Sequence, residues 1–366
     1  MSAAAKGPGV VRLGDDVRRA IDPTALENDL TRLWKRAAED GSTVSRACLA
    51  NIIVALPAGG DATELVEDIT RIHPSRVILV RPDPGRRPGE VEAWVSATCS
   101  RGDGDVLVCC ESITLELGPG GERAVPNAVR SLVVGDLRRV VLVEHVAWRE
   151  VVWIEDLGRS VDLVLADGAT LGPGDTLELW RRCAREEGPR SYRELVWTRL
   201  ADWRRAVAVG FDDLAREAFA AIADVRITVS QDTGAIPGAL LLAGWMASRL
   251  GWKAEAGTAD ALRREDGSTV ALAVETVPRG KDPARIREVT VGFGDAAPRR
   301  AWKRRSAERA IDVWVEGESE PRARFNRLKT SRASAVVREM HRRHGDPRAV
   351  EAMEIAGVLL RAITPR

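Results

Sequence analysis

The chain has 366 residues, of which 45% are apolar and 30% charged, and these proportions are typical of a folded globular protein with room for two domains. Its formal net charge of +1 does not favour a partner that binds the whole molecule by charge, such as nucleic acid or an anionic membrane. The N-terminus lacks the apolar segment of a secretory signal, no apolar run is long enough to span a bilayer, and five cysteines without regular spacing fit a reducing compartment. We therefore expect a cytoplasmic protein that does not associate with membranes.

The first half of the chain alternates between strand and helix patterns. We expect a flexible lead-in over residues 1–21 and an N-terminal α/β domain over 22–188. Its expected elements in chain order are a helix from Pro23, a strand over 50–56, a helix from Asp61, a strand over 76–80, a hairpin within 91–117, a short helix over 126–132, and strands over 139–143 and 161–166. This alternation predicts a largely parallel sheet with flanking helices and an antiparallel hairpin at its edge.

The second half, 189–366, reads as a separate α+β domain. The expected elements are helices over 192–209, 213–222, 237–250 and 347–362, and strands over 225–229, 269–274, 287–292 and 311–315. The fold class is therefore α/β, followed by a C-terminal α+β domain.

Motifs for nucleotide binding and catalysis are weak. There is no G-x-x-x-x-G-K-[ST] loop, and Gly292–Ala297 resembles a dinucleotide loop but is followed by Pro298 and arginines instead of a helix. Glu144 and His145 follow an expected strand and could form an acid–base pair, although a solvated strand end explains them as well. Asp167 also follows a strand, where α/β sheets bind ligands, but Asp-Gly is equally a turn.

Metal ligands are not indicated either. Cys109 and Cys110 are adjacent on an expected strand, so their side chains point to opposite faces and cannot share one ion with Cys99. His341 and His344 have a helical ligand spacing but no evident third ligand. Since every candidate group stands alone, the sequence predicts a protein without a catalytic set, a cofactor or a bound small molecule.

One stretch is strongly polarised. Residues 299–343 contain 14 Lys and Arg against 6 Asp and Glu, a local net charge of +8. The stretch could contact phosphates or bases, meet an acidic protein surface, or form a solvated face, and no nucleic-acid-binding motif accompanies it.

Several segments together resemble the glucose-6-phosphate dehydrogenase assembly protein (OpcA) family. The segments that carry the resemblance lie at 46–54, 73–80, 99–115, 125–126, 195–204 and 240–252, and the W-T-R-L-x-x-W-R pattern from Trp197 is the most specific. One departure follows Asp136, where the family's Asp-Leu-Pro and tandem Trp are replaced by Asp136-Leu137-Arg138-Arg139 and by lone Trp148 and Trp153.

The resemblance implies a non-catalytic protein that promotes assembly or activation of glucose-6-phosphate dehydrogenase in the oxidative pentose phosphate pathway. The alternative is an α/β protein or enzyme that binds a nucleotide or sugar phosphate at the sheet edge near Glu144, His145 and Asp167. Candidate partner contacts are exposed indoles and the start of the basic stretch: Trp148, Trp153, Arg299, Arg300, Trp302, Lys303, Arg304 and Arg305.

Overall fold

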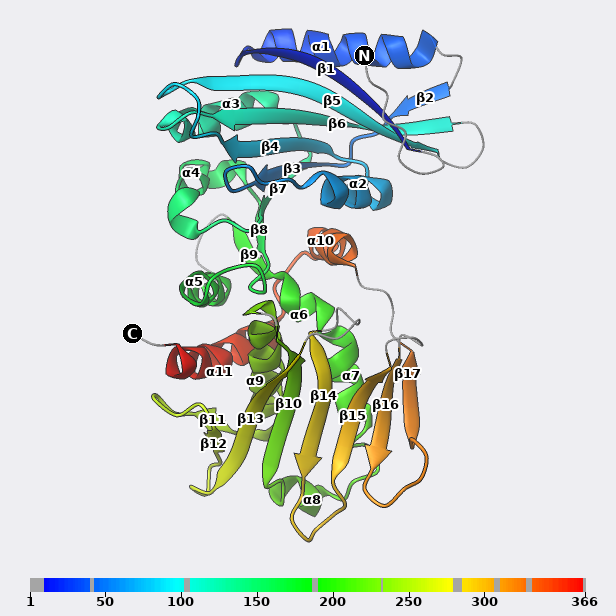
Figure 1. Ribbon diagram of the computed structural model, residues 1–366, viewed down its shortest axis with the longest axis vertical. Helices are drawn as coiled ribbons and strands as arrows, with labels where there is room; N and C mark the ends of the chain where they lie inside the picture. Colours follow the sequence, from blue (N-terminus) through cyan, green and yellow to red (C-terminus); the bar gives the residue numbers. More distant parts are fainter. Residues whose placement is uncertain are drawn as a thin grey trace. The chain divides into compact units, whose positions relative to one another are not determined.

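The computed structural model describes residues 10–39, 43–101, 106–185, 190–231, 233–278, 285–305, 310–326 and 331–364, and Figure 1 shows its elements. They form two compact units, each with its own mixed sheet. Unit 1 comprises the described residues of 1–166, 187–193 and 332–342, and unit 2 comprises those of 167–186, 194–331 and 343–366. No helix in the described part of the chain combines the length and apolar character needed to cross a membrane.

Unit 1 is built on a nine-stranded sheet that confirms the expected α/β class. Its strands are β1 (Val10–Ala20), β2 (Thr43–Arg46), β3 (Ala50–Ala55), β4 (Arg76–Pro82), β5 (Val91–Arg101), β6 (Val106–Leu117), β7 (Arg138–Val143), β8 (Leu163–Ala166) and β9 (Ser191–Glu194). Its helices are α1 (Pro23–Glu39), α2 (Thr63–Ile72), α3 (Val125–Leu132), α4 (Trp153–Asp156) and α10 (Arg332–His341), with short 3-10 turns at Gly121–Ala124, Trp148–Glu150 and Gly158–Ser160.

The core of this sheet is doubly wound. Strands β6, β4, β3, β7 and β8 lie side by side in parallel, and β3 is followed by β4 and β6 on one side and by β7 and β8 on the other. All six residues of β3 are buried, as expected for a strand covered on both faces. Strand β5 pairs antiparallel with β6 and confirms the expected hairpin, although β1 and not the hairpin forms the edge of the sheet. Strand β1 pairs with β5, so part of the expected lead-in is a strand.

Unit 2 carries an eight-stranded sheet and the remaining helices. Its strands are β10 (Asp224–Ser230), β11 (Lys253–Ala254), β12 (Ala261–Arg263), β13 (Thr269–Val277), β14 (Ile286–Gly292), β15 (Arg300–Arg305), β16 (Ala310–Val315) and β17 (Ala323–Asn326). Its helices are α5 (Pro173–Ala184), α6 (Leu195–Arg199), α7 (Ala201–Val209), α8 (Arg216–Ala220), α9 (Ile236–Leu250) and α11 (Pro347–Ile363), with a 3-10 turn at Thr233–Ala235. In Figure 1 helices α7 and α9 lie against this sheet.

The division between the units differs from the single boundary expected near residue 188. Helix α5 packs on α11 and therefore belongs to unit 2, whereas α10 packs on α2 and belongs to unit 1. Helices α9 and α11 approach closely because residue 244 is a glycine, since a Cβ there would lie 2.3 Å from the carbonyl oxygen of Ala352. These packings join segments far apart in the sequence, which local patterns do not reveal.

Candidate functional site

The carboxyl edge of the unit 1 sheet holds a pocket of about 400 Å³. It lies where β3, β4 and β6 end, which is the edge where doubly wound sheets bind ligands. The lining is mostly apolar and comes from Ala55, Leu56, Ala58, Val80, Pro82, Pro84, Leu117, Gly118, Pro119, Glu122, Arg149, Glu150, Val151, Val152 and Trp153. Val152 is 56% exposed, so this edge presents an apolar side chain to solvent.

The first turn after β3 does not have the chemistry of a phosphate cradle. A dinucleotide site places a pyrophosphate at the N-terminus of the following helix, where the backbone N–H groups are free. Here the Asp61 carboxylate accepts a hydrogen bond from the Thr63 N–H at 2.8 Å, so α2 begins with its own anion. Glu122 and Glu150 in the pocket lining add negative charge against the single cation of Arg149. This edge therefore disfavours an anionic ligand.

Glu144 and His145 lie at the end of β7, as expected, and the structure explains both. The buried Glu144 carboxylate is ion-paired with Arg332, which begins α10. His145 Nε2 lies 3.1 Å from Glu144 Oε1, but the ring is largely exposed and its backbone has a φ of 56°. Because the Glu144 carboxylate is bound to the Arg332 guanidinium, its role is to hold the start of α10 against the sheet. Neither Glu144 nor His145 lines the pocket described above.

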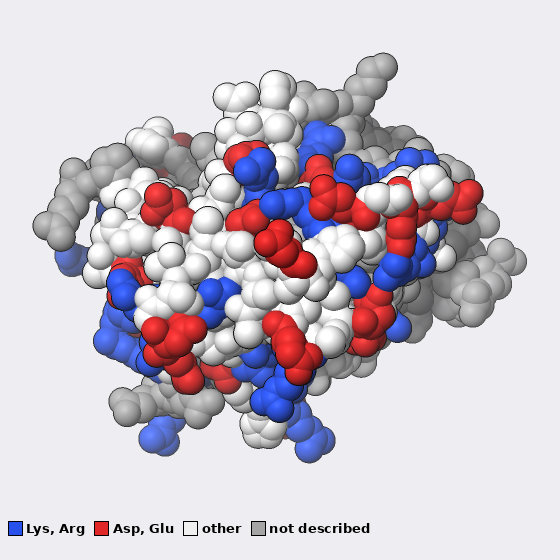
Figure 2. Space-filling view, turned by 90° about the horizontal axis from the view of Figure 1, so that it is seen from below, with Lys and Arg blue, Asp and Glu red and all other residues white. Residues whose placement is uncertain are grey.

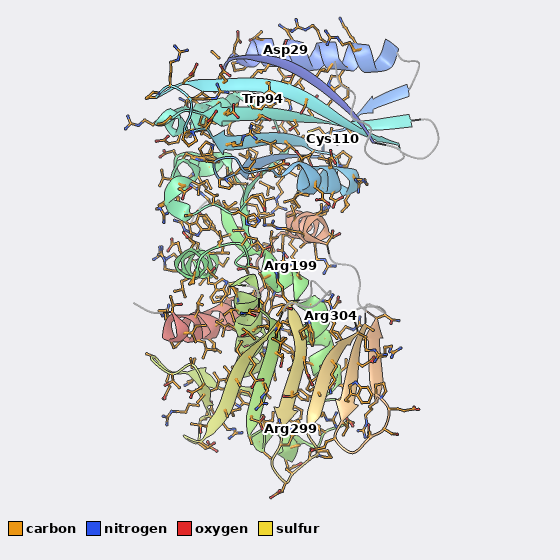
Figure 3. All side chains as sticks on the ribbon, in the orientation of Figure 1. Asp29, Trp94, Cys110, Arg199, Arg299 and Arg304 are labelled. Carbon is orange, nitrogen blue, oxygen red and sulfur yellow. The ribbon has the colours of Figure 1, made fainter. Side chains whose placement is uncertain are left out.

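Asp167 belongs to unit 2 and begins a buried polar cluster. Its Oδ1 accepts a hydrogen bond from Arg199 Nη2 at 2.8 Å, and Figure 3 shows Arg199 on α6. The Glu194 carboxylate accepts from the N–H groups of Val196 at 2.8 Å and Gly168 at 3.1 Å, and from the Trp180 indole at 2.9 Å. Burial, together with the charge of Asp167, raises the pKa of Glu194 to about 7.

This cluster packs too tightly to admit a ligand. A Cβ at Gly168 would lie 2.5 Å from Glu194 Oε2, so the glycine provides the room for the carboxylate. The Thr170 N–H donates to the Asp167 carbonyl at 2.8 Å, so Asp167 and Gly168 form a turn. A turn was one of the two alternatives that the sequence left open here. The sequence did not single out Glu194, Arg199 or Arg332, because their roles depend on partners distant in the chain.

The metal candidates do not assemble within the described residues. The structure contains no group of three or more His, Cys, Asp and Glu there that could hold an ion. Cys99 and Cys109 lie opposite each other in the β5–β6 register, but their side chains are outside the described part. The His341 ring contacts His73 edge-to-face at 5.0 Å, so it packs against α2's end.

The indole candidates lie beside the pocket of unit 1. Trp148 is half-buried and its ring contacts Tyr192 edge-to-face at 6.2 Å. Trp153 is buried and lines the pocket next to the exposed Val152. At the departure from the family pattern, Asp136 has a φ of 60°, and Arg138 donates to backbone carbonyls at the end of α10, including that of Arg342 at 3.2 Å.

The basic candidates lie on or beside β15 and divide between its two faces. Arg300 and Trp302 are buried: Trp302 is 0% exposed and its indole donates to the Ala206 carbonyl at 2.8 Å. Lys303 and Arg305 point to the opposite face and are exposed. Arg304 is half-buried near one end of the strands, and Arg299 lies at the other end (Figure 3).

The local charge of +8 is largely balanced by carboxylates from other segments. Arg299 pairs with Asp224 at 2.7 and 2.9 Å, Arg300 pairs with Asp213, and Arg332 pairs with Glu144. Arg300 and Arg322 together lower the pKa of the Asp213 carboxyl to about 2. Figure 2 shows acidic and basic side chains interspersed over one face of the molecule. Such a mixed surface does not favour nucleic acid.

Comparison with known proteins gives two family matches. Residues 66–182 match the glucose-6-phosphate dehydrogenase subunit N-terminal domain, and residues 190–349 match the corresponding C-terminal domain. Together they cover about three quarters of the chain.

Two cyanobacterial relatives and one solved structure are also similar. An OxPP cycle protein OpcA from Nostoc punctiforme is 27% identical over 234 residues, which are 63% of this chain and 48% of the relative. An OpcA from Synechocystis is 26% identical over 262 residues, 67% of this chain and 53% of that protein. The chain thus spans about half the length of these relatives. An oxidoreductase from Sinorhizobium meliloti superposes with a TM-score of 0.46 at 9% identity, covering 86% of this chain and 97% of that one, which is too low to support an argument. The family matches and the relatives agree, and the chain belongs to the OpcA family of glucose-6-phosphate dehydrogenase assembly proteins.

Proposed function

We propose that this chain is a non-catalytic, cytoplasmic partner of glucose-6-phosphate dehydrogenase that promotes the enzyme's active oligomeric state. The observation that carries this proposal is the match of both halves of the chain to domains described as parts of a glucose-6-phosphate dehydrogenase subunit. The names of the relatives support the same pathway, since they are called OxPP cycle proteins.

The chemistry of the described residues supports a role without catalysis. Both carboxylates that the sequence offered as catalysts are engaged in structure: Glu144 pairs with Arg332, and Asp167 pairs with Arg199. The edge of the unit 1 sheet, where a nucleotide would bind in a doubly wound fold, carries Asp61 at the helix start. Specific binding to a protein requires none of these groups to react.

The segment from Trp148 to Trp153 is the contact surface that we propose for the dehydrogenase. It combines an exposed apolar side chain, Val152, with a pocket lined by Trp153 and by Pro82, features typical of the centre of protein interfaces. Arg149 lies at the same edge and is largely exposed, which would favour an acidic group of the partner at the rim. An apolar anchor of the dehydrogenase would fill the pocket.

An activator must bind the competent state of its partner more tightly than the other states, because equal affinity shifts no equilibrium. The test is to titrate the purified full chain into an assay of the dehydrogenase from the same organism, with the enzyme diluted until sedimentation shows that its oligomer dissociates. The proposal predicts a saturable rise in rate together with a larger enzyme oligomer.

A matched control makes this titration specific. Val152→Asp should shift the titration to higher concentrations, whereas Val209→Asp, which changes an exposed valine of unit 2, should leave it unaltered. A wild-type chain that changes neither the rate nor the oligomer size of the dehydrogenase would contradict the proposed function.

A further inference from the structure

The outer face of the unit 2 sheet, on the side away from α7, presents exposed side chains over most of its width. Strands β13, β10, β14, β15, β16 and β17 lie side by side in this order. Their inward residues, such as Ile227, Val289 and Trp302, are buried on the side of α7, whose Ala206 carbonyl accepts the Trp302 hydrogen bond. Alternate residues point to the other side, where Arg226 and Lys303 remain exposed.

The strand register arranges the outward residues in two straight rows. The first row runs across the six strands through Glu275, Thr228, Glu288, Lys303, Asp312 and Arg324. The second row runs across five strands through Ala273, Arg226, Thr290, Ala301 and Trp314. The side chains in the middle of the second row, Thr290 and Ala301, are therefore small, and the half-buried indole of Trp314 lies at one end of the row.

Charge is distributed unevenly along the first row. Its half on β13, β10 and β14 carries Glu275 and Glu288, whereas its half on β15, β16 and β17 carries Lys303 and Arg324 with the buried Asp312, which pairs with Arg324, between them. Glu288 lies 3.5 Å from Lys303 and Glu275 lies 3.2 Å from Arg226, and the side chains of Glu275 and Lys303 are 48% and 51% exposed. Exposed pairs of this kind contribute little to stability, so they remain available for exchange with a partner.

A two-fold axis parallel to the strands, between β14 and β15, would bring these halves together. Such an axis places β13, β10 and β14 of one copy opposite β17, β16 and β15 of the other, and it preserves the position along the strands. Each row therefore faces the same row of the second copy. An axis perpendicular to the strands and running along the first row would instead oppose like charges. The pattern therefore favours the axis parallel to the strands, and a self-complementary patch of this kind is what a two-fold dimer requires.

We propose that this face binds a second copy of the chain through sheet-on-sheet packing about that axis. Each Glu288 then faces Lys303 of the second copy, and each Glu275 faces the other copy's Arg324. In the second row Thr290 meets Ala301, where the small side chains permit the separation of about 10 Å typical of stacked sheets.

The outer part of the second row adds a further match. Arg226 of one copy lies over Trp314 of the other, in the arrangement that favours attraction between a guanidinium and an indole. Six strands spaced by about 4.8 Å span roughly 24 Å between the outer strand axes, which is the width of an ordinary protein interface. This surface is distinct from the Trp148–Trp153 segment, so the proposal does not depend on the proposed function.

The test is sedimentation velocity of the full chain over a concentration series, with charge reversals at the centre of the face. The wild-type chain should form a dimer at about 10–100 µM, a range accessible to a polar interface of this size. Glu288→Lys and Lys303→Glu should each raise the dimer dissociation constant at least about tenfold. Either change puts like charges at the contact between positions 288 and 303 of the two copies, and the two-fold symmetry repeats that contact.

An equimolar mixture of the two variants should recover the dimer, since all its central contacts then pair opposite charges. The double variant should also dimerise, and it guards against a single variant that fails to fold. Glu351→Lys, which alters an exposed ion pair with Arg249 on the helical side, should dimerise as the wild type does. A wild-type chain that stays monomeric, single variants that dimerise normally, or a mixture without recovery would each overturn the proposal.

Discussion

Replacing Glu194 with Gln should change how the stability of the protein depends on pH. Folding raises the pKa of this carboxyl from its ordinary 4.5 to about 7 through burial and the nearby charge of Asp167. Between these values the folded protein keeps a proton that the unfolded chain has released. The free energy of unfolding therefore falls as pH rises, by about 1.4 kcal/mol per pH unit and about 3 kcal/mol in all.

Glutamine at position 194 cannot ionise, so this pH dependence should disappear. The amide oxygen can still accept from the Val196 N–H, but the amide nitrogen would face the N–H of Trp180 or Gly168. We expect that mismatch to cost about 1–3 kcal/mol, independent of pH. The variant is then less stable than the wild type at pH 5, and the difference shrinks or reverses by pH 8.

Urea unfolding followed by tryptophan fluorescence at pH 5, 6, 7 and 8 measures both curves. Burial and the neighbouring His341 lower the pKa of His73, which acts with the opposite sign in this range, but both proteins contain it and its effect cancels in the difference. Glu178→Gln is the control, because two arginines lower the pKa of Glu178 and its effect lies at acidic pH. Parallel curves for the wild type and Glu194→Gln would refute the reasoning.

Three further predictions concern unit 1. Arg332→Ala should destabilise the protein by about 3–5 kcal/mol in chemical unfolding, because it leaves the buried Glu144 carboxylate without its cation; a loss below 1 kcal/mol would exclude this role. Val152→Asp should weaken binding to the dehydrogenase at least about tenfold by calorimetry, with an unchanged melting temperature. A thermal-shift screen with nicotinamide nucleotides and sugar phosphates should show no stabilisation, whereas a true site at a hundredfold excess over Kd would contribute about 2.7 kcal/mol.

Local patterns predicted the elements whose burial depends on their own sequence. The continuous apolar run at 50–56 predicted β3, and the paired runs within 91–117 predicted the β5–β6 hairpin. Alternation of strands and helices was sufficient for the α/β class. The expected helix over 192–209, in contrast, is strand β9 followed by α6 and α7, because the buried Glu194 carboxylate caps α6 through the Val196 N–H.

Features that depend on distant partners were not predictable. The basic run at 300–305 was not predicted to form a strand, yet it is strand β15, in which Trp302 donates to the Ala206 carbonyl and Arg300 pairs with Asp213. These contacts remove Arg300 and Trp302 from the candidate partner surface, and leave Lys303 and Arg305 exposed on the outer face. The two rows of that face appear only when the strand register is known.

The central claim is that the chain acts by binding glucose-6-phosphate dehydrogenase, and the most direct measurement is sedimentation of the fluorescently labelled chain with the unlabelled enzyme. The labelled chain should move with the dehydrogenase in one faster species, and the Val152→Asp variant should sediment at the rate of the free chain. A labelled chain that sediments at the same rate with and without the enzyme would contradict the account.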